Sequence, residues 1–342
     1  MDRLVALQQI VPELELFLER RYNMLKVIRS KGPVGRRFIA AQLKCSERVV
    51  RGELDVLREQ GLVFTSSLGV QLSPQGENVL QTLQDVVREF HDLEYLEEKL
   101  AEVLNVGKMI VVPGDADVEP AGKRELAEAT ARYLCSILCE GDVLAVTGGT
   151  TLAKVAESFP SMGIQKHVTV VSARGGLGED VEIQANTIAA RLADKLGGTY
   201  RMLHAPEDVL PCYLEQIMNE PKIRDVINLG RRANVLLHGI GTAEEMAKRR
   251  GLDGELIMRL ITEGAVGEAF GYYFDSQGNI VYNTSSVGLR LEDLERIPKV
   301  ITVGGGRSKA WAVMSVLSRG YCDICITDEG VARRLMTLKE LN

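Results

Sequence analysis

The stretch DVLAVTGGTT, residues 142–151, decides the fold of most of this chain. Its first half is a short apolar run, which predicts a buried β-strand, and the glycines and threonines after it open a helical stretch at 151–158. Similar apolar runs alternate with helical stretches elsewhere in the chain. The other candidate strands span residues 109–113, 167–173, 233–240, 299–306 and 321–328. This alternation predicts an α/β domain, in which a parallel sheet is covered by helices.

Glycine-rich segments follow four of these strands, at residues 147–151, 173–178, 238–241 and 303–309. Ligands of parallel α/β folds bind beyond the carboxyl ends of the strands, so these segments are candidates for a binding site. Backbone N–H groups and threonine hydroxyls can donate to a phosphate there, and a guanidinium such as that of Arg174 can pair with it. The alternative, that each glycine only permits a turn, stays open for any single segment.

The chain lacks the usual nucleotide and metal motifs. GGGRSK, residues 304–309, does not have the GxxxxGK[ST] spacing, and no G-x-G-x-x-G follows the first strand. We therefore expect a small phosphorylated metabolite rather than ATP or NAD, and no cofactor. Cys322 and Cys325 have CxxC spacing, but on a strand they point to opposite faces, which does not suit a shared metal. Buried core thiols, without a metal, are the better interpretation of the cysteines.

Residues 46–60, SERVVRGELDVLREQ, are predicted to form the second helix of a helix-turn-helix. The apolar stripe of this helix consists of Val49, Val50, Leu54 and Leu57, and its outward-facing residues are Glu47, Arg48, Arg51 and Glu53. A shorter helix is expected at 35–43. Lys44 occupies the turn between the two helices, where a left-handed backbone would cost on the order of 1 kcal/mol.

The β-like runs at 62–65 and 70–73 then predict the hairpin of a wing, which could lie along a phosphate backbone. The candidate DNA-contacting residues are Arg36, Arg37, Ser46, Glu47, Arg48 and Arg51. A solvated helix without a partner shows similar charge patterns. The hairpin and the local positive charge together favour double-stranded DNA as the partner.

The charge is divided unevenly along the 342 residues, a length that itself suggests two domains. The net charge is −6, but residues 1–60 hold 12 Lys/Arg against 8 Asp/Glu, a balance of +4, which leaves −10 for the rest. A basic head on an acidic body is consistent with a nucleic-acid-binding domain joined to a different module. No apolar run has membrane length and no signal-peptide pattern is present, so we expect a cytoplasmic protein without membrane contact.

The segment between head and body carries apolar residues at alternating spacings of three and four. They are Val79, Leu83, Val86, Phe90, Leu93, Leu96, Leu100 and Leu104. Such a seam is typical of a dimerising coiled coil, although a packed core helix can show the same pattern. We therefore expect a winged helix-turn-helix domain at 1–74, a helical linker that dimerises at 75–106, and an effector-binding domain at 107–342.

Several motifs resemble the SorC family of sugar-responsive bacterial repressors over nearly the whole chain. They are SERVVRGE (46–53), VTGGTT (146–151), ARGGLGED (173–180), EAFGYYF (268–274) and GGGRSKA (304–310). The resemblance implies a winged-helix head and a Rossmann-like effector domain related to sugar-phosphate isomerases and deaminases. It also implies that fructose 1,6-bisphosphate weakens the hold of the protein on the operator of a glycolytic operon.

The resemblance further implies the residues that bind the sugar phosphate. Gly149, Thr150, Thr151 and Arg174 would hold one phosphate, with Gln184 nearby; Arg250 and Lys309 would serve the other, and Glu268 would bind sugar hydroxyls. Three cations and a helix N-terminus would then balance two phosphates. We expect a homo-oligomer, a dimer or a tetramer on DNA, because paired heads match paired half-sites.

The competing hypothesis is an isomerase or deaminase with an added DNA-binding domain. Such an enzyme needs a carboxylate base over a substrate carbon. Glu179, Asp180, Asp328 and Glu329 are the candidates. A helix cap or a contact to a ligand hydroxyl is the more economical role for them, so we expect a protein that is not an enzyme.

Overall fold

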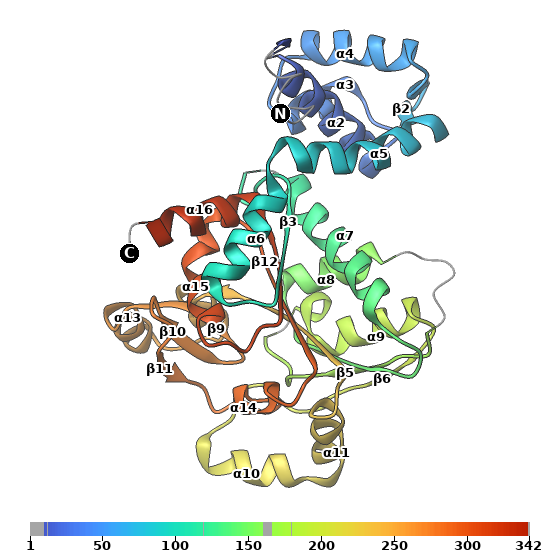
Figure 1. Ribbon diagram of the computed structural model, residues 1–342. Helices are drawn as coiled ribbons and strands as arrows, with labels where there is room; N and C mark the ends of the chain where they lie inside the picture. The colour runs from blue at the N-terminus through green and yellow to red at the C-terminus, as the bar shows by residue number, and fades with distance from the viewer. Residues whose placement is uncertain (1–9, 12, 119, 160–165, 179, 341–342) are drawn as a thin grey trace. The chain divides into compact units, whose positions relative to one another are not determined.

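The computed structural model describes residues 10–11, 13–118, 120–159, 166–178 and 180–340. The chain divides into two compact units, which are described separately. The head comprises Met1–Glu94 with Glu119–Ala121, and the body comprises Tyr95–Val118 with Gly122–Asn342 (Figure 1).

The head is a winged helix. Its elements are α2 (Leu14–Lys31), α3 (Arg36–Gln42), α4 (Glu47–Glu59), β1 (Val63–Ser66), β2 (Gly69–Leu72) and α5 (Pro74–Phe90). Val50, Leu54 and Leu57 of α4 are buried in one hydrophobic cluster that also takes residues from α2, α3 and α5. The two strands pair antiparallel as the predicted wing. Lys44, in the turn between α3 and α4, has a left-handed backbone with φ at 49°.

One head residue lies where the sequence did not place it. Glu53 was expected to face outward, but it is 8% exposed. Its carboxylate accepts hydrogen bonds from Arg21 Nε at 2.7 Å and from Arg20 Nη1 at 3.3 Å. Both arginines belong to α2, so their positive charges neutralise Glu53 and connect α4 to α2. The prediction was wrong because it considered only the residues of α4 itself.

The segment expected as one dimerising seam is two helices, α5 and α6 (Leu93–Leu104). The break falls at Asp92, which has a φ of 50°. In α5, Leu80 and Val87 belong to the head cluster. Leu100 of α6 is buried, and the Glu97 carboxylate accepts the N–H of Val111 in the body at 2.7 Å. The predicted seam is therefore divided at Asp92. Its α6 residues are buried within the chain, as the packed-helix alternative predicts, whereas its α5 residues are only half-buried, and dimerisation through the linker stays a prediction.

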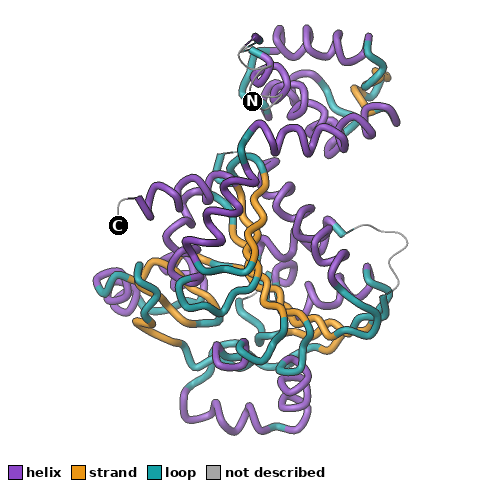
Figure 2. The backbone as a smooth tube through the Cα atoms, viewed as in Figure 1, coloured by secondary structure: helices purple, strands orange, loops and turns teal. Residues whose placement is uncertain are grey.

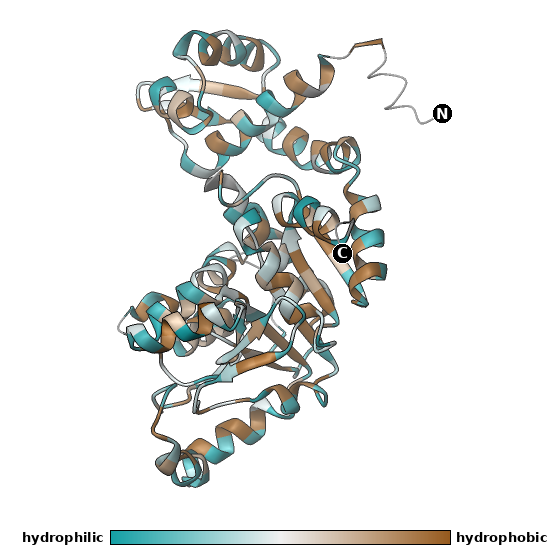
Figure 3. Cartoon of the chain, turned by 90° about the vertical axis from the view of Figure 1, so that its left-hand side faces the viewer, coloured by the Kyte–Doolittle hydropathy of each residue, from teal (hydrophilic) through white to brown (hydrophobic). Residues whose placement is uncertain are grey.

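The body is built on a seven-stranded parallel sheet in the order β3-β13-β12-β7-β4-β5-β6. In that order the strands are Lys108–Val112, Ile324–Asp328, Lys299–Gly304, Val235–Gly239, Val143–Val146, Thr169–Ser172 and Thr199–Arg201. The sequence predicted the first six and missed β6, which is three exposed residues at the edge. Figure 2 shows the strands in orange, and Figure 3 shows their hydrophobic residues in brown.

Helices cover both faces of this sheet. On one face, α7 (Pro120–Ile137), α8 (Thr150–Ser158) and α9 (Ala185–Lys195) form a large hydrophobic cluster with the strands. The body also contains α10 (Pro211–Asn219), α11 (Pro221–Gly230), α14 (Leu291–Leu294), α15 (Ala310–Leu317) and α16 (Glu329–Glu340). Across the described ranges, no helix is both long enough and apolar enough to span a membrane.

A second sheet, which the sequence did not predict, lies beside the first. Its strands, in the order β11-β10-β9-β8, are Ile280–Asn283, Tyr272–Asp275, Ala265–Ala269 and Gly241–Thr242. Two helices accompany it, α12 (Ala243–Arg249) and α13 (Gly254–Thr262). β9 and β10 are joined by Phe270 and Gly271, both with positive φ, which is the geometry of a two-residue hairpin turn. This sheet supplies part of the pocket described below.

The cysteines form no shared site within the described residues. Cys322 and Cys325 are buried free thiols, and burial raises the pKa of Cys322 to about 12. Cys139 and Cys212 are exposed, so the expectation of core thiols does not hold for these two. Among the residues that can be described, no group of three or more His, Cys, Asp or Glu could hold a metal ion.

Candidate functional site

A pocket lies at the carboxyl ends of β4, β5 and β7, where a parallel sheet is expected to bind its ligand. It encloses about 810 Å³, including solvent at its mouth. All eight residues predicted to bind the effector line it: Gly149, Thr150, Thr151, Arg174, Gln184, Arg250, Glu268 and Lys309. Segments up to 160 positions apart in sequence are therefore brought together at one place.

The first turn of α8 forms one wall of the pocket. Gly149 precedes the helix with a φ of 127°, and no side chain caps the helix. Thr150 and Thr151 follow it at the pocket surface. An uncapped helix start presents backbone N–H groups and a partial positive charge, and the two hydroxyls add further donors. This wall is suited to binding a phosphate.

Arg174 lines the pocket but its guanidinium is already bound. The residue is 3% exposed. Its Nε and Nη2 donate to Glu207 Oε1 at 3.0 and 2.6 Å. Its Nη1 donates to the carbonyls of Phe270 and Leu289. These bonds fix the β9–β10 turn against the end of β5.

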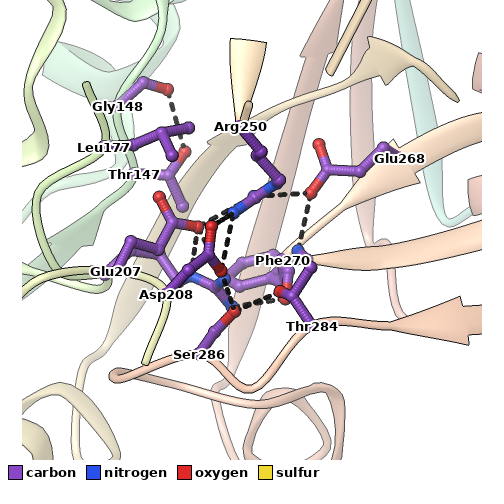
Figure 4. Close-up of polar contacts among 12 residues, drawn as sticks. Thr147, Gly148, Leu177, Glu207, Asp208, Arg250, Glu268, Phe270, Thr284 and Ser286 are labelled. Atoms are coloured by element: carbon purple, nitrogen blue, oxygen red, sulfur yellow. Dashed lines mark hydrogen bonds and ion pairs between the residues drawn. The ribbon is translucent and has the colours of Figure 1, made fainter. Parts of the chain in front are cut away.

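Arg250 is bound in the same way. Its side chain is 2% exposed. Its Nη2 donates to Glu207 at 2.8 Å and to Glu268 at 2.9 Å, and its Nη1 lies 3.1 Å from an oxygen of Asp208. Figure 4 shows Arg250 between Glu268 on one side and Glu207 and Asp208 on the other. Burial by itself would raise the pKa of Glu207. The positive charges of Arg174 and Arg250 have the larger effect and hold this pKa below its usual value.

This network changes the expected charge balance. Two guanidiniums meet the buried carboxylates of Glu207 and Glu268 and the half-buried carboxylate of Asp208, so the group has a formal charge of −1. Arg174 and Arg250 therefore bring no spare positive charge to a phosphate, contrary to the expectation that they and Lys309 are three available cations. The reason is that Glu207, which belongs to no motif, pairs with both arginines, and the adjacent Asp208 pairs with Arg250.

Two cations of the pocket wall have no carboxylate partner within the described part of the chain. They are Lys309, at the start of α15, and Arg249, in the last turn of α12. Sequence reasoning chose Arg250 and missed Arg249. Neighbouring residues of a helix point about 100° apart, so one of the two arginines faces the carboxylates and the other does not. The sequence alone does not show which of them it is. The two consecutive arginines were the only signal.

The two other polar residues of the prediction have different environments. Gln184 accepts the N–H of Leu177 at 2.9 Å and donates to the carbonyls of Leu177 and Gly178, so it holds the 175–178 loop in place. Glu268 Oε1 accepts from Arg250 and from the N–H of Gly271. Its Oε2 and that of Glu207 accept no hydrogen bond from the described residues, which leaves them available to sugar hydroxyls.

The head presents a separate basic face. Arg36 and Arg37 on α3 and Arg48 and Arg51 on α4 are exposed. Ser46 caps α4 by accepting the N–H of Val49. Glu47 lies 3.3 Å from Arg37, but side chains that are 56% and 90% exposed gain little from such a pair. Arg36, Arg48 and Arg51 have no ion pair with any described residue. This face is suited to phosphates and base edges.

Comparison with known proteins matches both units. A family described as "CggR N-terminal DNA binding domain" matches residues 17–87, and one described as "Putative sugar-binding domain" matches 88–337. The chain is 40% identical over 337 residues to the central glycolytic genes regulator of Bacillus subtilis, covering 98% of this chain and 99% of that protein. The chain belongs to the SorC family.

Other relatives agree with the SorC assignment. The central glycolytic genes regulator of Priestia megaterium is 40% identical, with 98% and 99% of the two chains covered. A crystal structure from Enterococcus faecalis, described as a "putative SorC family transcriptional regulator", is 36% identical with a TM-score of 0.65 and covers 71% of this chain and 99% of that one. The full-length sorbitol operon regulator of Klebsiella pneumoniae shares the fold, with a TM-score of 0.68 at 18% identity over 89% and 94% of the chains.

This SorC-family chain is a transcriptional regulator with a DNA-binding and a sugar-binding domain, and not an enzyme. The carboxylates proposed for catalysis have structural contacts. Both oxygens of Asp328 accept backbone N–H groups, from Ala116, Gly306 and Val331. Glu329 accepts the N–H of Gly114 and pairs with Arg333. Asp180 caps the short helix Val181–Ile183, and Glu179 lies outside the described residues.

Proposed function

We propose that this protein represses a glycolytic operon and that fructose 1,6-bisphosphate, or a related phosphosugar, binds the body pocket and weakens its hold on operator DNA. The whole-length identity to regulators of central glycolytic genes supports the genes controlled. The observation that carries the effector class is the pocket itself. Its walls hold the uncapped start of α8 and two cations that have no carboxylate partner among the described residues.

The pocket has groups suited both to the phosphates and to the hydroxyls of a phosphosugar. Each phosphate carries close to two negative charges near neutral pH. The first turn of α8, Arg249 and Lys309 supply donors and positive charge for them. The Oε2 atoms of Glu207 and Glu268 accept hydroxyls, while their Oε1 atoms stay on Arg250. A pocket with carboxylates beside phosphate-binding groups discriminates a sugar phosphate from inorganic phosphate.

Release of the protein from DNA follows from thermodynamic linkage between effector binding and operator binding. If effector binding lowers the affinity for the operator by some factor, operator binding must lower the affinity for the effector by the same factor. Two copies of the head bound together would match two half-sites of an operator, so we propose a dimer, or a tetramer on DNA, as the binding species.

The test is fluorescence anisotropy on a labelled duplex from upstream of the operon that contains its gene. Titrations are run with and without saturating fructose 1,6-bisphosphate at fixed salt, and the Lys309→Ala variant is the control that keeps DNA binding but loses the response. An operator affinity that stays unchanged across a panel of saturating glycolytic phosphosugars overturns the proposal. A thermal-shift panel ranks the sugars, since the true effector stabilises most at equal concentration.

A further inference from the structure

Gly52 is an unexplained glycine in the middle of the helix proposed to enter the major groove. It is the sixth of the 13 residues of α4, and it is exposed. Glycine weakens a helix interior relative to alanine, because it has more backbone freedom to lose on folding. A glycine at such a position therefore calls for a local reason.

The fold of the head does not provide that reason. A Cβ atom added at Gly52 would meet no atom within 4 Å, and its φ lies outside the positive range that favours glycine. By contrast, an added Cβ at Gly69 of the wing would lie 2.7 Å from the carbonyl oxygen of Val34. Packing and backbone conformation therefore explain Gly69 and leave Gly52 unexplained.

The residues beside Gly52 on the surface of α4 indicate what kind of ligand this face can bind. Arg48, Arg51, Gly52 and Asp55 stand at positions i, i+3, i+4 and i+7, which form one face of a helix. The opposite face is buried through Val50, Glu53, Leu54 and Leu57. Arg48 and Arg51 are exposed and have no ion pair with described residues, whereas Asp55 pairs with Arg58 at 2.8 Å. The glycine thus adjoins the two cations of this face that remain available to a ligand.

We propose that Gly52 is the point where the backbone of α4 lies against base edges on the floor of the operator's major groove. The missing side chain lets the helix seat deeply enough for Arg48 and Arg51 to reach acceptors on the bases, such as the O6 and N7 of guanine. Gly52 is a positioning residue, and its role rests on the proposed placement of α4 in the groove.

The test compares side chains of increasing size at this position in the full-length chain. The duplex is one selected from a random pool by the native protein, so that its sequence need not be known in advance. Gly52→Ala and Gly52→Leu keep or raise the melting temperature, since both residues favour helix. They weaken DNA binding by at least tenfold, with leucine the weaker binder. Gln81→Ala, on the exposed face of α5, is the matched control and leaves the affinity unchanged.

Salt dependence separates positioning from charge. Gly52→Ala removes no cation, so the slope of log affinity against log salt stays that of the native protein. Arg48→Ala weakens binding as well, but because it removes a positive charge from the groove, it also lowers this slope.

The outcomes are distinguishable. Binding by Gly52→Ala within twofold of native, with Arg48→Ala and Arg51→Ala impaired, overturns the role of Gly52 and leaves α4 in the groove. A melting temperature that falls in Gly52→Ala also overturns it, because the glycine would then serve the fold. If all three substitutions leave DNA binding unchanged, the placement of α4 itself is wrong.

Discussion

Arg249 and Arg250 are consecutive residues with opposite environments, so substituting each by alanine separates binding from stability. Arg250 is buried among three carboxylates. Arg249 lines the pocket without a carboxylate partner in the described chain. We expect Arg250→Ala to destabilise the body and Arg249→Ala to weaken effector binding.

The magnitudes follow from the contacts. Without Arg250, Glu268 and Asp208 lose their ion pair while Glu207 keeps only Arg174, and breaking such a buried pair costs about 3–5 kcal/mol. For a unit of this size, about 2–4 °C in Tm accompanies each kcal/mol, so Tm falls by roughly 6–20 °C. Loss of Arg249 removes one hydrogen bond from a charged donor, worth about 1.5–3 kcal/mol. The Kd for fructose 1,6-bisphosphate then rises roughly 10- to 150-fold.

Differential scanning calorimetry without ligand and isothermal titration with fructose 1,6-bisphosphate measure the two effects. Lys248→Ala is the control, since Lys248 is exposed and pairs only with Glu244 on its own helix among the described residues. It should leave both quantities unchanged. The reasoning is refuted if Arg250→Ala keeps the native Tm while abolishing binding, or if Arg249→Ala binds the effector as tightly as the native protein.

Three further predictions concern other contacts. Glu53→Ala leaves Arg20 and Arg21 without their shared carboxylate and should lower the urea-unfolding free energy of the head by about 1–3 kcal/mol, with a loss below about 0.5 kcal/mol contradicting its role. Gln184→Ala frees the 175–178 loop and should weaken effector binding measured by titration, while operator affinity without effector stays native. Burial lowers the pKa of His238 to about 4, so the unfolded chain binds a proton that the folded chain does not between about pH 6.5 and 4. Stability should therefore fall as the pH falls through that window, by about 3 kcal/mol near pH 4, and His238→Gln should lose this part of the pH dependence in melts.

Sequence reasoning succeeded where a local pattern has one structural meaning. Alternating apolar runs and helical stretches predicted the sheet around Val143–Val146, and Ser46 with its turn predicted the start of α4. The wing followed from two short runs around Gly69. The sequence pattern did not predict Thr199–Arg201, because a three-residue edge strand has no apolar signal. It also did not predict the break beside Asp92, because the heptad pattern continues through this left-handed residue.

The sequence by itself determined a basic winged-helix head, an α/β body and the glycine-rich ends where the pocket forms. These follow from periodicity, turn chemistry and charge, which act over a few residues. Only the tertiary structure decided which cations of the pocket are available to a ligand. Glu207 and Glu268 approach Arg174 and Arg250 from distant segments and neutralise them, whereas Arg249 and Lys309 meet no carboxylate in the described chain. Charge pairing in a buried site depends on distances in space, and spacing along the chain does not contain them.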